Sequence, residues 1–383
     1  MLVEQVLYKD GKFSRNKASD TLMHHSNTLV LGFGEKNVLL DEGIYESLSK
    51  QYTDADIVLC STSGEIYDEM VMENSVSVVA IEFQKTSFKT VTLNISNFPD
   101  SFEAGKRLFS ELDEKGLAYV MVLSDGSLVN GSKLVKGIGE MNIRHIPVTG
   151  GLAGDADNFD FTLVGCNAKP AQGNIVAIGF YGEHLQIGHS SLGGWDMFGP
   201  ERKVTRSVEN RVYEIDGKSA LDTYKKYLGK YADQLPGSAL LFPLFVQQSG
   251  SADRVVRTIL SIDNTTNSMV FAGDIPEGSY VRFMKANFDK LIGAASDAAS
   301  QVLIDFPGKP ATSPKFALLI SCVGRKLILG KRIEEEVEAV KDIFGQNTLF
   351  SGFYSYGEIS PLLPNQHCEL HNQTMTITTF YED

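Results

Sequence analysis

Tryptophan, cysteine and positive charge are all scarce in this chain, and each scarcity narrows what the protein can do. Its 383 residues include one tryptophan and four cysteines, and 35 basic residues face 48 acidic ones, for a net charge of −13. This excess of negative charge argues against a nucleic-acid groove or an anionic membrane surface as the main partner. The cysteines lie far apart and form no C-x-x-C pair, so we expect reduced thiols rather than a disulfide framework.

Long apolar runs are absent as well. No stretch approaches the ~18 apolar residues of a membrane span. The N-terminus also lacks the basic and apolar regions of a signal peptide. We therefore expect a cytoplasmic protein without a membrane anchor.

The chain has enough apolar sequence for large cores, since hydrophobic residues make up 43% of it and charged residues 22%. Single cores usually stop growing near ~250–300 residues, so two lobes are expected. Apolar strands alternate with helices whose apolar residues recur every three or four positions. The prediction is a mixed α/β protein with two lobes, residues 1–215 and residues 216–383, each with a mixed sheet flanked by helices.

Two neighbouring strands are expected to form a hairpin. Residues 76–83 and 88–95 are rich in β-branched side chains, and the second segment alternates apolar with polar residues. Two such segments in succession are typical of an antiparallel hairpin with one face in solvent.

Three stretches of the chain share one plan, in which an apolar strand, a turn and a helix lead to a second strand and a polar loop. The loops are Ser63-Gly-Glu-Ile66, Gly150-Gly-Leu-Ala-Gly154 and Tyr356-Gly-Glu-Ile359. The first and third share Gly-Glu-Ile, which either marks distant structural repeats in the two lobes or is a coincidence of three residues. Ligands of α/β sheets tend to bind at the carboxyl ends of strands, so these loops are candidate walls of a binding cleft.

Catalytic signatures are missing. The chain has no G-x-S-x-G elbow, no H-E-x-x-H motif and no complete dinucleotide or phosphate-loop fingerprint. His367, Cys368 and His371 are close in sequence, but zinc usually needs a fourth ligand, and an ordinary polar turn explains them as well. No pair of nucleophile and base can be recognised from spacing, so the protein is not expected to be an enzyme.

The C-terminal third carries the most specific motifs: Ser321-Cys-Val-Gly-Arg325, Gly352-Phe-Tyr-Ser-Tyr-Gly-Glu-Ile359 and His371-Asn-Gln-Thr-Met-Thr376. Together they resemble the C-terminal domain of FIST proteins, whose name stands for F-box and intracellular signal transduction. The first lobe resembles the FIST N-terminal domain through Ser63-Gly-Glu-Ile66 and Gly150-Gly-Leu-Ala-Gly-Asp155. The resemblance spans roughly residues 25–380.

The resemblance implies a sensory protein that binds a small ligand, proposed for the family to include amino acids, and that signals through a separate partner. Histidine kinases, cyclic-dinucleotide enzymes and chemotaxis receptors are the outputs that the family implies. Some bacterial members are described as heme-binding nitric oxide sensors, so the alternative function is a heme-based nitric oxide sensor. The leading interpretation requires no cofactor. Heme would need a histidine ligand, for which His189, near Trp195, is the first candidate.

The expected ligand site is drawn from loops and strand ends of both lobes. It comprises Gly64, Glu65, Gly150, Gly151, Asp155, Cys322, Arg325, Tyr356, Glu358, Asn372 and Thr374.

These residues also have structural interpretations. Arg325 could grip a carboxylate with two parallel hydrogen bonds, or form a salt bridge with Glu358 or a helix acid. Glu65 and Glu358 could receive an ammonium group, or accept backbone N–H groups that fix a loop. The glycines could present N–H groups to an anion or make tight turns. Cys322 could be a thiol activated by Arg325 or a small buried side chain, and Tyr356 could line a pocket or pack the sheet.

Overall fold

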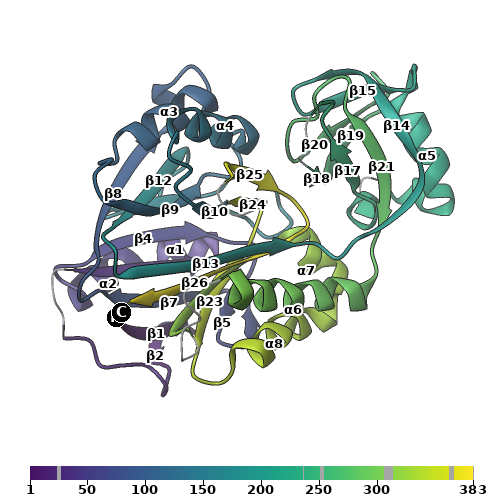
Figure 1. The fold of residues 1–383 in the computed structure, drawn as a ribbon. Helices are drawn as coiled ribbons and strands as arrows, with labels where there is room; N and C mark the ends of the chain where they lie inside the picture. The colour runs from purple at the N-terminus through teal and green to yellow at the C-terminus, as the bar shows by residue number, and fades with distance from the viewer. Residues whose placement is uncertain (24–26, 236, 251–253, 306–313, 362–365, 383) are drawn as a thin grey trace.

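The structure is a computed structural model that describes residues 1–23, 27–235, 237–250, 254–305, 314–361 and 366–382. Its body consists of three mixed β-sheets with helices on their outer faces, and a smaller unit stands beside it (Figure 1). The predicted α/β class, with mixed sheets flanked by helices, is confirmed.

Each sheet of the body contains six strands in the described part of the chain. The first, in the order β11-β4-β3-β7-β1-β2, is made of β1 (Leu2–Lys9), β2 (Lys12–Arg15), β3 (Thr28–Gly34), β4 (Asp56–Ser61), β7 (Ser75–Glu82) and β11 (Val164–Cys166). The second, β25-β24-β10-β9-β12-β8, is made of β8 (Ser87–Asn94), β9 (Leu117–Ser124), β10 (Val148–Leu152), β12 (Asn174–Tyr181), β24 (Gly357–Pro361) and β25 (Cys368–His371). The third, β13-β26-β22-β23-β5-β6, is made of β5 (Glu65–Tyr67), β6 (Met70–Met72), β13 (Leu185–Leu192), β22 (Phe316–Cys322), β23 (Leu349–Ser355) and β26 (Met375–Glu382).

All three sheets have one plan. Each contains a parallel pair of strands joined by helices: β3 with β4, β9 with β10, and β22 with β23. The strand after each pair leaves its own sheet and pairs antiparallel with a strand of another pair: β5 with β23, β11 with β4, and β24 with β10. A later strand then returns beside the first strand of its own pair, as β7, β12 and β26 do. The body therefore consists of three repeats that exchange strands in a ring, where the sequence suggested repeats in two lobes.

Equivalent backbone hydrogen bonds close this ring. The Ser63 N–H donates to the Tyr354 carbonyl at 2.8 Å, the Gly154 N–H to the Ser61 carbonyl at 2.9 Å, and the Tyr356 N–H to the Leu152 carbonyl at 3.2 Å. Each repeat thus accepts one of these bonds and donates another, and its donating residue lies two positions after its accepting residue in the chain. Ser63, Gly154 and Tyr356 are therefore equivalent, and the three loops found in the sequence lie at equivalent places.

The inner faces of the three sheets share one core. Along β3, Leu29, Leu31 and Phe33 enter the common core, whereas Val30 points to the outer face. Strands that are buried on both faces read as continuous apolar runs, which is why β3, β9 and β22 could be recognised in the sequence.

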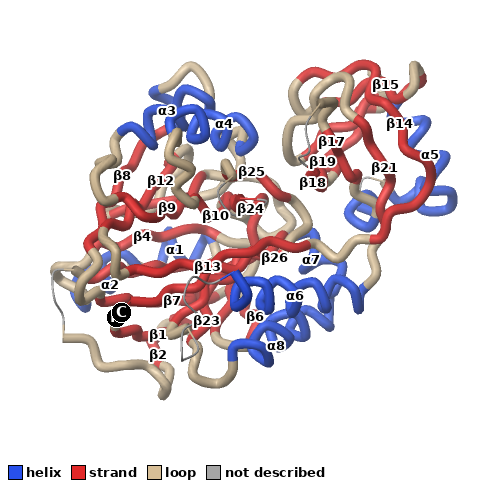
Figure 2. The backbone as a smooth tube through the Cα atoms, in the orientation of Figure 1, coloured by secondary structure: helices blue, strands red, loops and turns tan. Residues whose placement is uncertain are grey.

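Helices cover the outer faces (Figure 2). They are α1 (Lys36–Asp41) and α2 (Ile44–Gln51) on the first sheet, α3 (Ser101–Ser110) and α4 (Gly131–Met141) on the second, and α6 (Phe288–Asp305) and α8 (Ile333–Phe344) on the third. The short helix α7 (Val323–Leu329) directly follows β22. The remaining body elements are the 3-10 helices η1 (Ile95–Asn97) and η4 (Gly330–Arg332).

The smaller unit lies between β13 and α6 in the chain and has its own core. Its elements are β14 (Asp196–Val208), β15 (Arg211–Ile215), β16 (Lys218–Ser219), α5 (Ala220–Leu228), η2 (Gly229–Gln234), η3 (Gly237–Leu241), β17 (Leu244–Gln247), β18 (Arg254–Arg257), β19 (Ile259–Asp263), β20 (Ser268–Phe271) and β21 (Tyr280–Lys285). Strands of residues 316–382 interleave with those of the first 192 residues, so the body draws on both of the expected parts of the chain, residues 1–215 and 216–383.

The expected hairpin of residues 76–83 and 88–95 is wrong. β7 pairs with β3 and β1 in the first sheet, whereas β8 pairs with β12 at the edge of the second. Every residue of β7 is buried, while most of β8 is half-exposed. The two strands thus suit different sheet positions, and each finds its partner elsewhere.

Candidate functional site

Two buried carboxylates occupy equivalent positions where a strand leaves one sheet for another. Glu65 begins β5, and its carboxylate accepts hydrogen bonds from Thr62 Oγ1 at 2.5 Å and from Ser75 Oγ at 2.7 Å. Thr62 lies three residues before the acid, and Ser75 begins the returning strand β7. The remaining repeat has Val164 at this position, opposite Cys60.

Glu358 is held in the same way. Ser355 Oγ, three residues before it, donates at 2.6 Å, and Thr374 donates from its hydroxyl at 2.9 Å and from its N–H at 3.2 Å. Thr374 directly precedes the returning strand β26. The predicted Glu358 and Thr374 are therefore in contact, and Glu358 is bound to the protein itself.

Burial raises the pKa of both carboxyls, to about 7 for Glu65 and about 8 for Glu358. The hydrogen bonds to the ionised form act in the opposite direction but are weaker than desolvation. These contacts support a loop-fixing role for both residues rather than an exposed acceptor for a ligand.

Arg325 is fully buried in α7, and protein acceptors surround its guanidinium. Nε and Nη2 donate to Glu336 Oε2 of α8 at 3.0 and 2.8 Å. Nη2 also donates to the Leu291 carbonyl at 2.8 Å, and Nη1 to the Gly193 carbonyl at 2.6 Å. Of the two interpretations, the geometry supports the salt bridge with a helix acid. Arg325 fastens α7 to α8, to α6 and to the linker that leads to the smaller unit.

Two of the three predicted glycines, Gly150 and Gly151, serve close packing of strands. Gly150 has a φ of +153°, and a Cβ there would lie 1.8 Å from the Val122 carbonyl oxygen of β9. A Cβ at Gly151 would lie 2.8 Å from a methyl group of Ile320 in the common core. Any side chain here would force the sheets apart.

Other predicted residues also have partners within the protein. Asp155 is buried and pairs with Lys36 Nζ at 2.8 Å. Asn372 accepts a hydrogen bond from the Thr258 N–H of the smaller unit at 3.4 Å. Cys322 is buried, and burial raises the pKa of its thiol far above the ordinary value, despite the nearby Arg325. The geometry therefore does not support an activated thiol.

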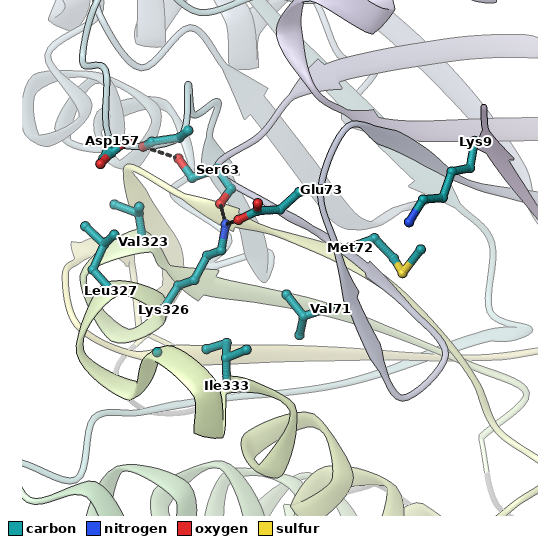
Figure 3. A pocket seen from close by; sticks show the side chains of 12 residues that line it. Lys9, Ser63, Val71, Met72, Glu73, Asp157, Val323, Lys326, Leu327 and Ile333 are labelled. Atoms are coloured by element: carbon teal, nitrogen blue, oxygen red, sulfur yellow. Dashed lines mark hydrogen bonds and ion pairs between the residues drawn. The ribbon is translucent and has the colours of Figure 1, made fainter. Parts of the chain in front are cut away.

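A cavity of about 560 Å³ lies directly beside these residues, and we call it the strand-end pocket. All three repeats contribute to it: Ser63 and the β5–β6 hairpin, the loop at Ala156 and Asp157, and α7 followed by Ile333 (Figure 3). This position is the one that strand-end loops predict for a ligand.

Lys326 of α7 reaches across this pocket to the first repeat (Figure 3). Its Nζ donates to the Ser63 carbonyl at 2.7 Å and to Glu73 Oε1 at 2.6 Å. The Lys326 side chain is 15% exposed, whereas Glu73 is 67% exposed. Lys9 and Asp157 add one charge of each sign, so the pocket is lined by two ammonium groups and two carboxylates.

None of the eleven predicted site residues lines the strand-end pocket, and four of them adjoin its lining in the chain. Gly64, Asp155, Cys322 and Arg325 each directly adjoin a lining residue in the chain. The sequence prediction did not include Lys326. Helix geometry offered a signal for it: consecutive helical residues point about 100° apart, so if Arg325 faces the core, Lys326 faces away from it. Tyr356 lines a different cavity, between the body and the smaller unit.

The histidines considered for metal and heme ligation lie at separate places in the described part of the chain. His371 Nε2 lies 2.9 Å from the Ser360 carbonyl, and Cys368 is buried. The described part of the chain holds no group of three His, Cys, Asp or Glu residues that could hold a metal ion. His189 lies in β13 opposite Thr378 and lines neither of the two cavities named above, so heme binding through it stays a prediction.

Comparison with protein families gives two adjoining matches. The FIST N domain matches residues 28–218, and the FIST C domain matches residues 220–361. Their junction falls inside the smaller unit, in β16 directly before α5. No curated protein matches the chain. Among the described helices, none has the length and apolar character to cross a membrane. With nearly the whole chain covered by these two domains, the protein belongs to the FIST family.

Proposed function

We propose that this FIST protein is a sensor without catalytic turnover, and that it binds a small zwitterion, such as an amino acid, in the strand-end pocket. The observation that carries the proposal is the presence of Lys326, Glu73 and the Ser63 carbonyl in one cavity built from all three repeats. FIST domains are associated with sensory signal transduction, which supports the sensory role. The volume of about 560 Å³ lies within the range of small-molecule pockets.

The chemistry of binding follows from the charges. A ligand carboxylate takes the place of Glu73 on Lys326 Nζ, and the released Glu73 accepts hydrogen bonds from the ligand ammonium. Glu73 is mostly exposed, so this exchange moves one flexible side chain and leaves the core unchanged. With Lys9 and Asp157 also lining the pocket, the charges balance, which suits a zwitterion better than a dianion.

The signal would pass to a separate protein, a histidine kinase, a cyclic-dinucleotide enzyme or a chemotaxis receptor being the partners that the family implies. The alternative, a heme-based nitric oxide sensor, predicts a Soret band in protein purified with heme present. A Soret band together with no binding of any amino acid would favour the heme-based sensor over the zwitterion sensor.

A thermal-shift screen with the twenty amino acids tests the proposal, followed by calorimetry on any hit. A ligand at a hundredfold excess over its Kd stabilises the folded state by about 2.7 kcal/mol. Lys326→Met should weaken binding by at least tenfold, because a hydrogen bond to a charged group contributes about 1.5–3 kcal/mol. Lys331→Met, an exposed lysine in η4, is the matched control and should bind like the wild type. Equal affinity in the Lys326 and Lys331 variants would exclude this pocket.

A further inference from the structure

A second cavity, of about 410 Å³, separates the body from the smaller unit, and we call it the inter-unit cleft. Tyr356, Phe159 and the loop before α4 line it on the body side. Leu260, Phe271 and Asn210 line it on the side of the smaller unit. Small-molecule pockets occur preferentially at such boundaries between units.

The body side of the cleft carries a flat aromatic wall. Phe159 stacks on Tyr356 with ring centroids 4.8 Å apart and planes inclined by 17°. The Phe159 N–H also donates to the Tyr356 hydroxyl at 3.2 Å. Phe159 is 47% exposed and has a φ of +52°, a conformation that is uncommon for a bulky residue. The backbone thus holds the Phe159 ring in a fixed position although nearly half of this side chain stays exposed to solvent.

The opposite wall is also apolar. Leu260 of β19, at 43% exposure, faces the cleft, and the fully buried Phe271 of β20 lies behind this wall. A planar molecule could therefore be sandwiched between an aromatic pair and an aliphatic surface. Aromatic rings prefer such offset-stacked arrangements at centroid separations of about 4.5–7 Å.

The charge of the inter-unit cleft differs from that of the strand-end pocket. Its lining residues include one carboxylate, Asp160, and the amides Asn130 and Asn210, but no lysine, arginine or histidine. An anionic ligand would find no cationic side chain among the lining residues, and the nearby Lys36 already pairs with Asp160 at 3.7 Å. A neutral ring with hydrogen-bonding edges would find stacking surfaces and amide partners.

We propose that the inter-unit cleft is a second ligand site, for a neutral planar heteroaromatic molecule of the size of a purine base or nucleoside. The site is distinct from the strand-end pocket, because the two cavities share no lining residue and differ in charge. It lies between two covalently linked units, so a molecule that fills it also changes how firmly the smaller unit is held to the body.

The linker between the units contains a natural reporter. Trp195 is the chain's one tryptophan and directly precedes β14 of the smaller unit. Its Nε1 donates to the Gln373 carbonyl of the body at 3.0 Å. Gly194 has a φ of +75°, and a Cβ there would lie 2.1 Å from the Lys290 carbonyl oxygen, so the linker is tightly seated. A shift of the smaller unit changes the surroundings of this indole.

Titration of the full chain with adenine and adenosine, followed by calorimetry and by Trp195 fluorescence, tests the proposal. Phe159→Ala should weaken binding by about tenfold, because stacking of a base on an aromatic side chain contributes about 1–3 kcal/mol. Ile143→Ala is the control: this residue is 80% exposed just beyond the far end of α4 and should leave binding unchanged. Tyr356→Leu, which keeps an apolar side chain, should also weaken binding.

Three outcomes would overturn the assignment. One is the absence of both heat and fluorescence change with either compound. Another is equal affinity in the Phe159→Ala and Ile143→Ala variants, which would place the ligand elsewhere. The third is loss of adenine binding in Lys326→Met, because that result would place it in the strand-end pocket. Retained adenine binding in that variant supports a separate site, whatever the amino-acid screen shows.

Discussion

Replacement of Glu358 by glutamine should change how the stability of the protein depends on pH. Burial raises the folded-state pKa of this carboxyl from an ordinary value of 4.5 to about 8. Between these two pH values the folded state keeps a proton that the unfolded state loses. Because the unfolded state binds fewer protons there, the free energy of unfolding falls as the pH rises. Each unit of pKa difference corresponds to about 1.4 kcal/mol, so ionisation of Glu358 alone should lower the free energy of unfolding by on the order of 4 kcal/mol between pH 5 and pH 8.

Glutamine matches the protonated acid in shape but cannot ionise. Its amide can accept from the Thr374 N–H and donate to Ser355 Oγ, two of the three groups that now contact the carboxyl. At pH 5, where Glu358 is protonated in the folded state, the variant should match the wild type to within about 1 kcal/mol, the net value of one hydrogen bond. At pH 8 the variant should be the more stable protein by a few kcal/mol.

Urea unfolding followed by circular dichroism at pH 5, 6, 7 and 8 measures the difference. Glu65→Gln should act in the same direction over a shorter interval, because the folded-state pKa of Glu65 is about 7. Glu338→Gln, at an exposed position of α8, is the control and should leave the pH dependence unchanged. Parallel stability curves for the wild type and Glu358→Gln would refute the reasoning, because they would mean that Glu358 ionises alike in both states.

Three further predictions concern other buried groups. Burial lowers the pKa of His371 from 6.5 to about 4, so the unfolded state binds more protons in that window and stability falls as the pH drops through it. His371→Gln should remove this dependence in urea unfolding measured between pH 4 and pH 7, and an unchanged loss of stability toward low pH would contradict it. Arg325→Met leaves Glu336 buried without its cation and should cost about 3–5 kcal/mol in urea unfolding at pH 7. Adding Glu336→Gln should restore part of the loss, whereas strictly additive losses would argue against coupling. Cys322 should resist iodoacetamide in the native protein and react after unfolding, as read by mass spectrometry, because burial raises the pKa of its thiol; labelling of native protein would restore the reactive-thiol hypothesis.

The fold class could be predicted because its signals are local. The strands β3, β9 and β22 are buried on both faces, so their sequences are apolar throughout. Their partners could not be predicted, because the exchanged strands β5, β11 and β24 are three to five residues long and pair with distant repeats. Nothing in so short a segment specifies a partner hundreds of residues away. The mistaken hairpin of residues 76–83 and 88–95 has the same origin, since closeness in sequence was taken for pairing.

Only four of the eleven predicted site residues adjoin the lining of the strand-end pocket in the chain, for a related reason. Glycines and acids at strand ends attract attention in a sequence, but Gly150 and Glu358 are required by the fold, one for close strand approach and the other for a buried hydrogen-bond network. The side chains that line the strand-end pocket, such as Lys326 and Glu73, belong to no recognisable pattern. Lys326 lies in a short helix, and its role in the pocket can be recognised only from the fold, which places Ser63 and Glu73 of the first repeat opposite it.

The ring of exchanged strands gives the two proposed sites a physical connection. The Ser63 carbonyl accepts from Lys326 in the strand-end pocket, while the Ser63 N–H donates to the Tyr354 carbonyl at 2.8 Å. Two residues further, Tyr356 forms the aromatic wall of the inter-unit cleft. A ligand that draws Lys326 away from Ser63 therefore acts on the same short backbone segment that positions Tyr356. If the two ligands influence each other through this segment, linkage requires that each change the affinity of the other by the same factor. Three separate sheets would not impose this connection, because it arises from the exchange of strands between repeats.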